Sequence, residues 1–191
     1  MRICVFCASS AKVAPIFFDE ANVLASAIAD AGHTIVCGGG AMGLMGCLAD
    51  ATVARGGKII GIIPEFMKQV EWNHTGLNEL ITVDTMHRRK ELLITDVDAV
   101  VALPGGCGTL EELMEVITLK RLGKFTKPII IVNTNGFYNY LLAFFDEMIA
   151  KKFMRPEHKD AWTVVNRSEE VLSAIECAKP WSCEAIHFAA V

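Results

Sequence analysis

The sequence lacks several features that would assign it to a common class of protein. No apolar run approaches the ~20 residues that a membrane-spanning helix needs, and residues 1–6 enter a strand-like run instead of a signal peptide. The H-E-x-x-H and G-x-S-x-G signatures are also absent, so zinc hydrolysis and serine-triad chemistry have no support. We therefore expect a cytoplasmic protein without a membrane partner.

Positive charge is scarce as well, and the cysteines form no recognisable metal motif. The 191 residues carry a net charge of −4, which disfavours a general nucleic-acid binder, so local groups have to hold any anionic ligand. Seven cysteines are scattered along the chain. Cys4 and Cys7 lie in one apolar run, where strand residues three apart face opposite ways. These cysteines predict reduced core thiols and no metal site.

Short apolar runs alternate with stretches of helical periodicity, and this alternation predicts the fold. We expect strands at 2–7, 33–37, 58–63, 80–83, 99–103, 128–132 and 162–165. We expect helices at 15–31, 47–55, 85–95, 109–122, 137–151 and 168–178. All-apolar strands of this kind predict a parallel sheet covered on both faces. The chain is thus expected to form a single-domain, Rossmann-like, doubly wound α/β fold over 1–178, with an irregular tail over 179–191 and with His158 at the periphery.

Three turns stand at the carboxyl ends of predicted strands, at 8–10, 38–46 and 104–112, and we expect them to converge on one crevice. The second turn reads G-G-G-A-M-G-L-M-G and formally contains a dinucleotide fingerprint. It follows the second strand, however, and no acidic residue ends the next strand, which disfavours an NAD-dependent enzyme. Phosphate contact or tight packing is the preferred interpretation, and a role in chain geometry alone is the alternative.

The third turn reads P-G-G-C-G-T-L-E-E and leads into a helix. Its glycines permit close approach of a ligand, and N–H groups at the start of a helix favour an anion such as phosphate. Thr109 and Glu112 have the spacing of a capping box, which predicts a helix that begins at Thr109 and gives Glu112 a structural role. The alternative is an ionised carboxylate that steadies a developing cation or orients a water molecule. The residues alone leave both interpretations open.

Two predicted helices carry further candidates. Residues 86–90, M-H-R-R-K, form either a solvated basic face or part of a site. Glu111 and Thr118 lie on one side of the next helix, where solvent exposure is the simpler explanation. Val116 and Leu119 give that helix a second apolar strip, so the helix is either deeply buried or packed against a second subunit, and we favour a dimer contact.

Taken together, these motifs resemble those of the LONELY GUY (LOG) family of cytokinin riboside 5′-monophosphate phosphoribohydrolases. The family pattern P-G-G-x-G-T-x-x-E stands at 104–112, M-H-x-R-K at 86–90, and G-G-G-x-x-G-L-M-G at 38–46. The resemblance covers nearly the whole chain, to about Ala178. The first turn departs from it, because Ala8 stands where the family usually has a glycine before two serines.

The resemblance implies hydrolysis of the N-glycosidic bond of an adenosine 5′-monophosphate, N6-prenylated forms included, to free base and ribose 5-phosphate. It implies a cytoplasmic homodimer that produces active cytokinin without a metal or an organic cofactor. Arg89 and Glu112 would be the catalytic pair. The implied substrate-binding residues are Ser9, Gly39, Gly40, Glu71, Met86, Arg89, Lys90, Gly105, Gly106, Cys107, Gly108, Thr109, Leu110, Glu111 and Thr118. The alternative is a non-hydrolytic nucleotide-binding or carrier protein of the same superfamily, although a pure binder need not keep both catalytic residues.

Overall fold

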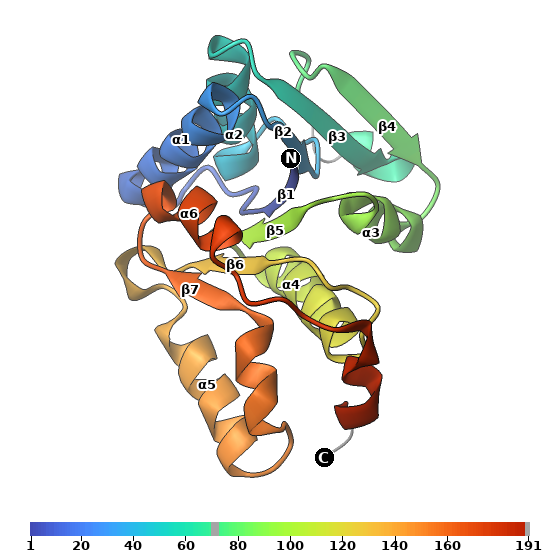
Figure 1. Cartoon of the computed structure of the whole chain (residues 1–191). Helices are drawn as coiled ribbons and strands as arrows, with labels where there is room; N and C mark the ends of the chain where they lie inside the picture. Colours follow the sequence, from blue (N-terminus) through green and yellow to red (C-terminus); the bar gives the residue numbers. More distant parts are fainter. Residues whose placement is uncertain (70–72, 190–191) are drawn as a thin grey trace.

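The central element of the fold is a parallel sheet (Figure 1). The computed structural model describes residues 1–69 and 73–189, and in this part of the chain seven strands pair in the order β4-β3-β2-β1-β5-β6-β7. The strands are β1 (Arg2–Phe6), β2 (Thr34–Cys37), β3 (Lys58–Pro64), β4 (Glu79–Val83), β5 (Ala99–Ala102), β6 (Ile129–Val132) and β7 (Thr163–Val165). Each neighbouring pair is parallel. The predicted fold class is therefore confirmed.

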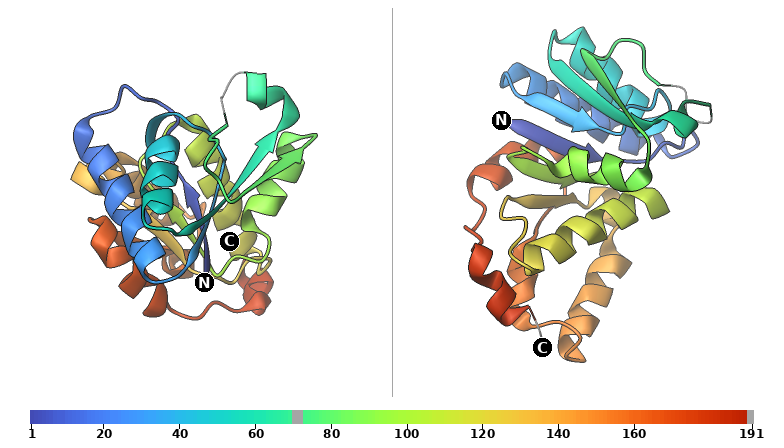
Figure 2. Two further views of the ribbon diagram at one scale, coloured as in Figure 1. Left: turned by 90° about the horizontal axis from the view of Figure 1, so that it is seen from above. Right: turned by 90° about the vertical axis from the view of Figure 1, so that its right-hand side faces the viewer.

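Helices cover both faces of the sheet, as Figures 1 and 2 show. One face carries α1 (Pro15–Asp30), α2 (Gly43–Ala54) and α6 (Val171–Glu176), and the other carries α3 (Met86–Ile94), α4 (Cys107–Arg121) and α5 (Asn139–Ala150). Successive side chains of a strand point to opposite faces, so Ile3 and Val5 enter one apolar cluster while Cys4 and Phe6 enter the other. The near-continuous apolar strands are explained by these two separate cores.

The strand order creates one switch point, between β1 and β5. From β1 the chain winds outward through β2, β3 and β4, and it then returns to the other side of β1 with β5. Loops that leave β1 and β5 at their carboxyl ends therefore diverge to opposite faces and leave a crevice between them. The turns at 8–10 and 104–112 follow these two strands.

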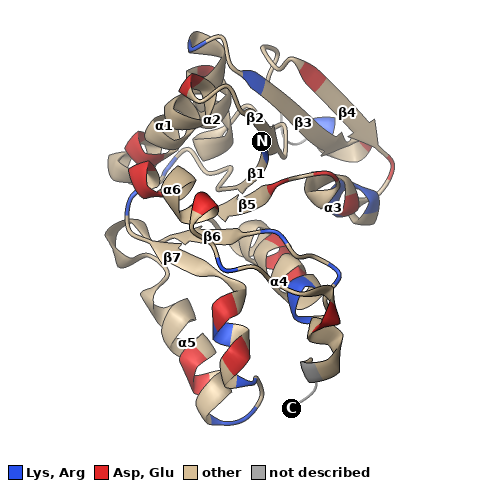
Figure 3. Cartoon of the chain, in the orientation of Figure 1, with Lys and Arg blue, Asp and Glu red and all other residues tan. Residues whose placement is uncertain are grey.

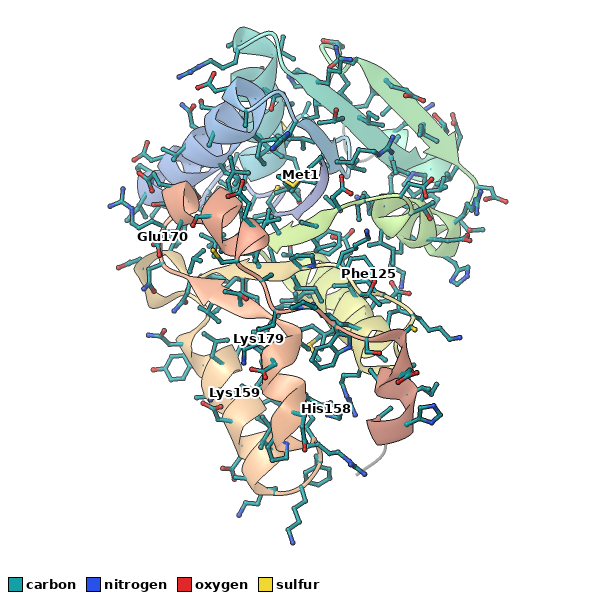
Figure 4. All side chains as sticks on the ribbon, viewed as in Figure 1. Met1, Phe125, His158, Lys159, Glu170 and Lys179 are labelled. Atoms are coloured by element: carbon teal, nitrogen blue, oxygen red, sulfur yellow. The ribbon has the colours of Figure 1, made fainter. Side chains whose placement is uncertain are left out.

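Short 3-10 helices complete the chain: η1 (Glu65–Gln69), η2 (Thr134–Gly136), η3 (Pro156–Ala161), η4 (Ser168–Glu170) and η5 (Cys183–Phe188). His158, labelled in Figure 4, lies in η3 and is buried, so its expected peripheral position is wrong. Its ring Nδ1 accepts a hydrogen bond from the backbone N–H of Arg155 at 3.1 Å. Lys159 and Lys179, labelled in the same figure, form ion pairs with Asp146 and Asp160.

The segment after α6 packs against the carboxyl end of α4. The indole N–H of Trp181 donates to the carbonyl of Lys120 at 2.7 Å, and the guanidinium of Arg121 donates to the carbonyl of Ala189 at 3.2 Å. η3 and η5 also contact α4. Val116 is fully buried and Leu119 packs against the same cluster, so the strip expected to form a dimer contact is covered by the chain itself.

Candidate active site

The three predicted turns converge on one cavity at the switch point, as expected. Its volume is about 330 Å³, and its walls come from the loop after β1, the glycine turn after β2, α3, and the start of α4. Two hydrogen bonds hold the turns together: the N–H of Ala8 donates to the carbonyl of Pro104 at 3.3 Å, and the N–H of Leu44 donates to the carbonyl of Ala8 at 2.9 Å. Gly43 permits this approach, since it adopts a φ of +61° and a Cβ there would lie 2.4 Å from the carbonyl carbon of Ser9.

The start of α4 forms one wall of the cavity. The helix begins at Cys107 with Gly106 as its N-cap, and no side chain caps it. The predicted capping box is therefore wrong: Thr109 is the third residue of the helix, and Glu112 is the sixth. Gly106, Cys107, Gly108 and Thr109 all line the cavity, so the N–H groups that lack partners within the helix lie at its wall. This end of the helix is suited to bind an anion.

Gly105 contributes to the same turn without lining the cavity. A Cβ on this residue would lie 2.1 Å from Oγ1 of Thr109. The glycine therefore lets the buried Thr109 side chain fold back against the turn, which fixes the path of the chain into α4.

Arg89 reaches the cavity from α3. The hydroxyl of Thr85 caps α3 by accepting a hydrogen bond from the N–H of Arg88 at 3.1 Å. The Arg89 side chain is only 6% exposed, and its Nε donates to the carbonyl of Ile62 at 3.1 Å. Its Nη1 lies 3.6 Å from the sulfur of Met67. This buried cation provides a fixed positive charge at the cavity.

Glu112 brings a half-buried carboxylate to the same cavity. The charges of Arg89 and Glu112 both act on two buried thiols, Cys4 in the middle of β1 and Cys37 at the end of β2. Burial raises the pKa of the Cys4 thiol well above its usual value, and the nearby Glu112 carboxylate raises it further while Arg89 opposes the shift. Burial also raises the pKa of Cys37 to about 11. These thiols stay neutral at physiological pH, which leaves Arg89 and Glu112 as the opposite charges at this end of the sheet.

Methionines supply much of the remaining wall. Met45, Met67 and Met86 line the cavity from α2, η1 and α3. The resemblance implied Met86 alone, and the other two were missed because methionine in an amphipathic stretch normally indicates core packing. Thioether groups adapt to the faces of aromatic rings, so this wall suits a planar base. Ser9, also predicted, lies at the mouth of the cavity and is exposed.

Other predicted residues lie away from the cavity wall. Lys90 forms ion pairs with Glu111 and Glu115, and Figure 3 shows basic residues on α3 and acidic residues on the neighbouring α4. Thr118 is exposed, and its hydroxyl donates to the carbonyl of Met114 at 2.8 Å. Leu110 packs against the core beneath α4. Glu71 lies outside the described residues.

In the glycine turn after β2, the glycine that lines the cavity is not one of the two predicted to bind substrate, Gly39 and Gly40. Gly39 has a φ of +77°, and a Cβ there would lie 3.2 Å from the Cα of Gly61, so it serves the packing of β3. Gly40 forms an isolated antiparallel β-bridge with Asn73. The residue of this turn that lines the cavity next to Arg89 is Gly38, which the motif contained but did not single out.

Two properties of the described residues bear on the class of protein. No group of three or more His, Cys, Asp or Glu side chains within 1–69 and 73–189 is placed to hold a metal ion. Across the same ranges, no helix has the length and hydropathy needed to cross a bilayer.

Comparison with known proteins agrees with the motifs. Residues 45–175 match a family described as "Possible lysine decarboxylase". The cytokinin riboside 5′-monophosphate phosphoribohydrolase LOG5 of Arabidopsis thaliana is 38% identical over 94% of this chain and 78% of its own length. The Arabidopsis enzyme LOG2 is 43% identical over 80% of this chain and 72% of its own. The chain belongs to the LOG family.

Solved structures outside the close LOG relatives share the fold. A molybdenum cofactor binding protein from Rippkaea orientalis aligns with a TM-score of 0.70 at 20% identity, over 92% of this chain and 94% of that one. The molybdenum cofactor carrier protein of Chlamydomonas reinhardtii has the same TM-score and identity, over 92% of this chain and 95% of its own. At this identity the likeness shows the fold alone, so the LOG motifs and the cavity carry the argument about function.

Proposed function

We propose that this chain hydrolyses the N-glycosidic bond of N6-substituted adenosine 5′-monophosphates and of AMP itself, and so produces active cytokinin. The observation that carries the proposal is the placement of Arg89 and Glu112, which reach one cavity from two different helices beside the open start of α4. The names of the LOG relatives support the same activity.

The nucleotide phosphate binds the N–H groups at the start of α4, where the helix dipole favours negative charge. This contact positions the ribose between Glu112 and Arg89. Binding energy from the phosphate, which does not react, thus orients the glycosidic bond for hydrolysis. The methionine wall formed by Met45, Met67 and Met86 receives the base.

The reaction breaks the bond between C1′ and N9 of the base. A water oxygen bonds to C1′, the electron pair of the broken bond goes to the base, and the protons of water are shared between base and sugar. The transition state has oxocarbenium character, and the Glu112 carboxylate stabilises its positive charge and guides the water. The Arg89 cation offsets negative charge on the phosphate or on the departing base.

The proposal includes two statements about the whole protein. It places the chain in the reducing cytoplasm, in keeping with seven free thiols. It also makes the chain a homodimer, for which α5 is the candidate surface. Tyr140 is 92% exposed and Phe144 59%, one helical turn apart, and exposed aromatic patches mark interfaces. Light scattering of the protein and of Phe144→Glu tests this part: the variant should be monomeric.

Purified protein incubated with AMP and with isopentenyladenosine monophosphate provides the test of the activity. Release of free base and ribose 5-phosphate, separated by chromatography, supports the proposal. Tight nucleotide binding without products would instead assign the chain to the carrier proteins of the superfamily. Absence of both products and binding would overturn the proposal.

A further inference from the structure

Three contacts define the position of the Arg89 guanidinium at the carboxyl ends of β2 and β3. Nε donates to the carbonyl of Ile62 on β3 at 3.1 Å, and Nη1 lies between the sulfur atoms of Met67 and Met86 at 3.6 and 3.9 Å. Nη2 lies against Gly38, the first residue after β2. A Cβ on Gly38 would stand 2.3 Å from Nη2 and 3.5 Å from Cζ.

The backbone of Gly38 does not itself require glycine. Gly39 and Gly43 in the same turn adopt φ angles of +77° and +61°, a region that side chains disfavour, whereas Gly38 does not have a positive φ. The other close neighbour of a Cβ at Gly38 is the sulfur of Met45 at 3.1 Å. Both obstructing groups are the mobile ends of long side chains, so an alanine here would displace Arg89 before it displaced the strand.

We propose that Gly38 is a positioning residue for Arg89: the missing side chain leaves the space in which the guanidinium is held against the Ile62 carbonyl. This inference rests on the proposed function, because it assigns Gly38 a role in the turnover that Arg89 supports. An added methyl group moves Nη2 away from the sheet end and weakens the Nε hydrogen bond. Misplacement of a catalytic group by about 1 Å can cost about 100-fold in rate.

A double-mutant cycle tests the proposal with Gly38→Ala, Arg89→Ala and the two changes combined. We expect kcat of Gly38→Ala to fall by about 10- to 100-fold while KM changes less, because the phosphate contacts at α4 are untouched. In the Arg89→Ala background the glycine change should have almost no further effect on kcat. Equal fold-losses in both backgrounds, or an unchanged kcat in Gly38→Ala, would overturn the proposal.

Folding of the variants, followed by circular dichroism and thermal unfolding, tests separately whether the added methyl group conflicts with Arg89. If Gly38→Ala fails to fold but the double variant folds, the conflict lies with Arg89 and the proposal stands. If the double variant also fails to fold, the added methyl group meets something other than Arg89, and the proposal is wrong.

A readout that needs no activity separates this inference from the proposed function. The Nε–H of Arg89 should give a slowly exchanging ¹⁵N–¹H signal, since it is buried and bonded to Ile62. Gly38→Ala should shift that signal and accelerate its exchange, and an unaltered signal would contradict the proposal. Failure of the wild-type protein to hydrolyse nucleotides would overturn the function while leaving this geometric result intact.

Discussion

The ammonium group of Lys90 on α3 lies 3.1 Å from the carboxylate of Glu115 on α4, and it also pairs with Glu111. The hydrogen bond that Lys90 donates to the Glu111 carboxylate raises the pKa of the lysine, so it stays charged over the working pH range. Arg89 and Glu112 are the chain neighbours of this cluster, and both face the cavity. The ion pairs therefore join the two helices that carry the proposed catalytic pair.

Replacing Lys90 by methionine should lower kcat by aligning α3 and α4 less well. Stability should fall by about 1 kcal/mol, because Glu111 is exposed to solvent and Glu115 is only half-buried. The double change Glu111→Gln and Glu115→Gln removes the same ion pairs and should reproduce this effect. Steady-state kinetics and urea unfolding measure both quantities. A large rise in KM in Lys90→Met alone would instead show direct contact between Lys90 and the nucleotide.

Replacing Glu112 by glutamine should abolish most turnover without unfolding the protein. The carboxylate is half-buried in the second turn of α4, and glutamine keeps its size and its capacity to accept hydrogen bonds, so the free energy of unfolding should change by less than about 1 kcal/mol. The loss in kcat should be about 10² to 10⁴-fold, the usual contribution of a general acid or base. Glu176→Gln at the exposed end of α6 is the matched control and should keep full activity. A folded Glu112→Gln variant with wild-type kcat would contradict the assignment.

Replacing Tyr138 by phenylalanine should lower the free energy of unfolding, because it removes a hydrogen bond at the start of the third turn, 104–112. The buried Tyr138 hydroxyl donates to the carbonyl of Leu103 at 2.7 Å, immediately before Pro104. Burial raises the pKa of this phenol, so it remains a donor at every working pH. Losing the bond leaves a buried carbonyl unpaired and should cost about 1 to 3 kcal/mol in urea unfolding. An unchanged midpoint would mean that another group satisfies Leu103.

Lys120 should give stability a distinct pH dependence. Burial lowers the pKa of this lysine from 10.5 to about 8 in the folded protein, where its ammonium donates to the carbonyl of Lys127. Between these two values the unfolded chain binds more protons than the folded one. The free energy of unfolding therefore rises with pH from about 8 to about 10.5 through this group, and below pH 8 its contribution is constant.

Lys120→Met serves as the comparison, because raised thiol pKa values give the opposite slope above pH 9. The wild-type protein should gain between about 1 and 2 kcal/mol relative to the variant from pH 8 to pH 9.5. Urea unfolding at several pH values measures the difference. Parallel curves would show that Lys120 titrates normally in the folded state.

Local patterns in the sequence determined the fold class and the main motifs. Apolar periodicity located the strands and α-helices of the described residues to within four residues at each end, because it records which side of an element is buried. Glycine and proline located the turns at 38–46 and 104–112, since these residues restrict or free the backbone locally. The convergence of the turns followed from parallel topology, which brings the carboxyl ends of strands to one edge.

Contacts between distant segments decided what the patterns left open. Thr109 and Glu112 have capping-box spacing, yet α4 begins earlier because the backbone at Gly106 takes the cap position. Lys90 pairs with α4, which no spacing along its own helix could reveal. Gly38 lies against Arg89, 51 positions away in the chain, and only the packing of α3 against β3, next to β2 in the sheet, brings them together. Local sequence records burial and backbone freedom, whereas the partner of a buried charge is fixed by the tertiary fold.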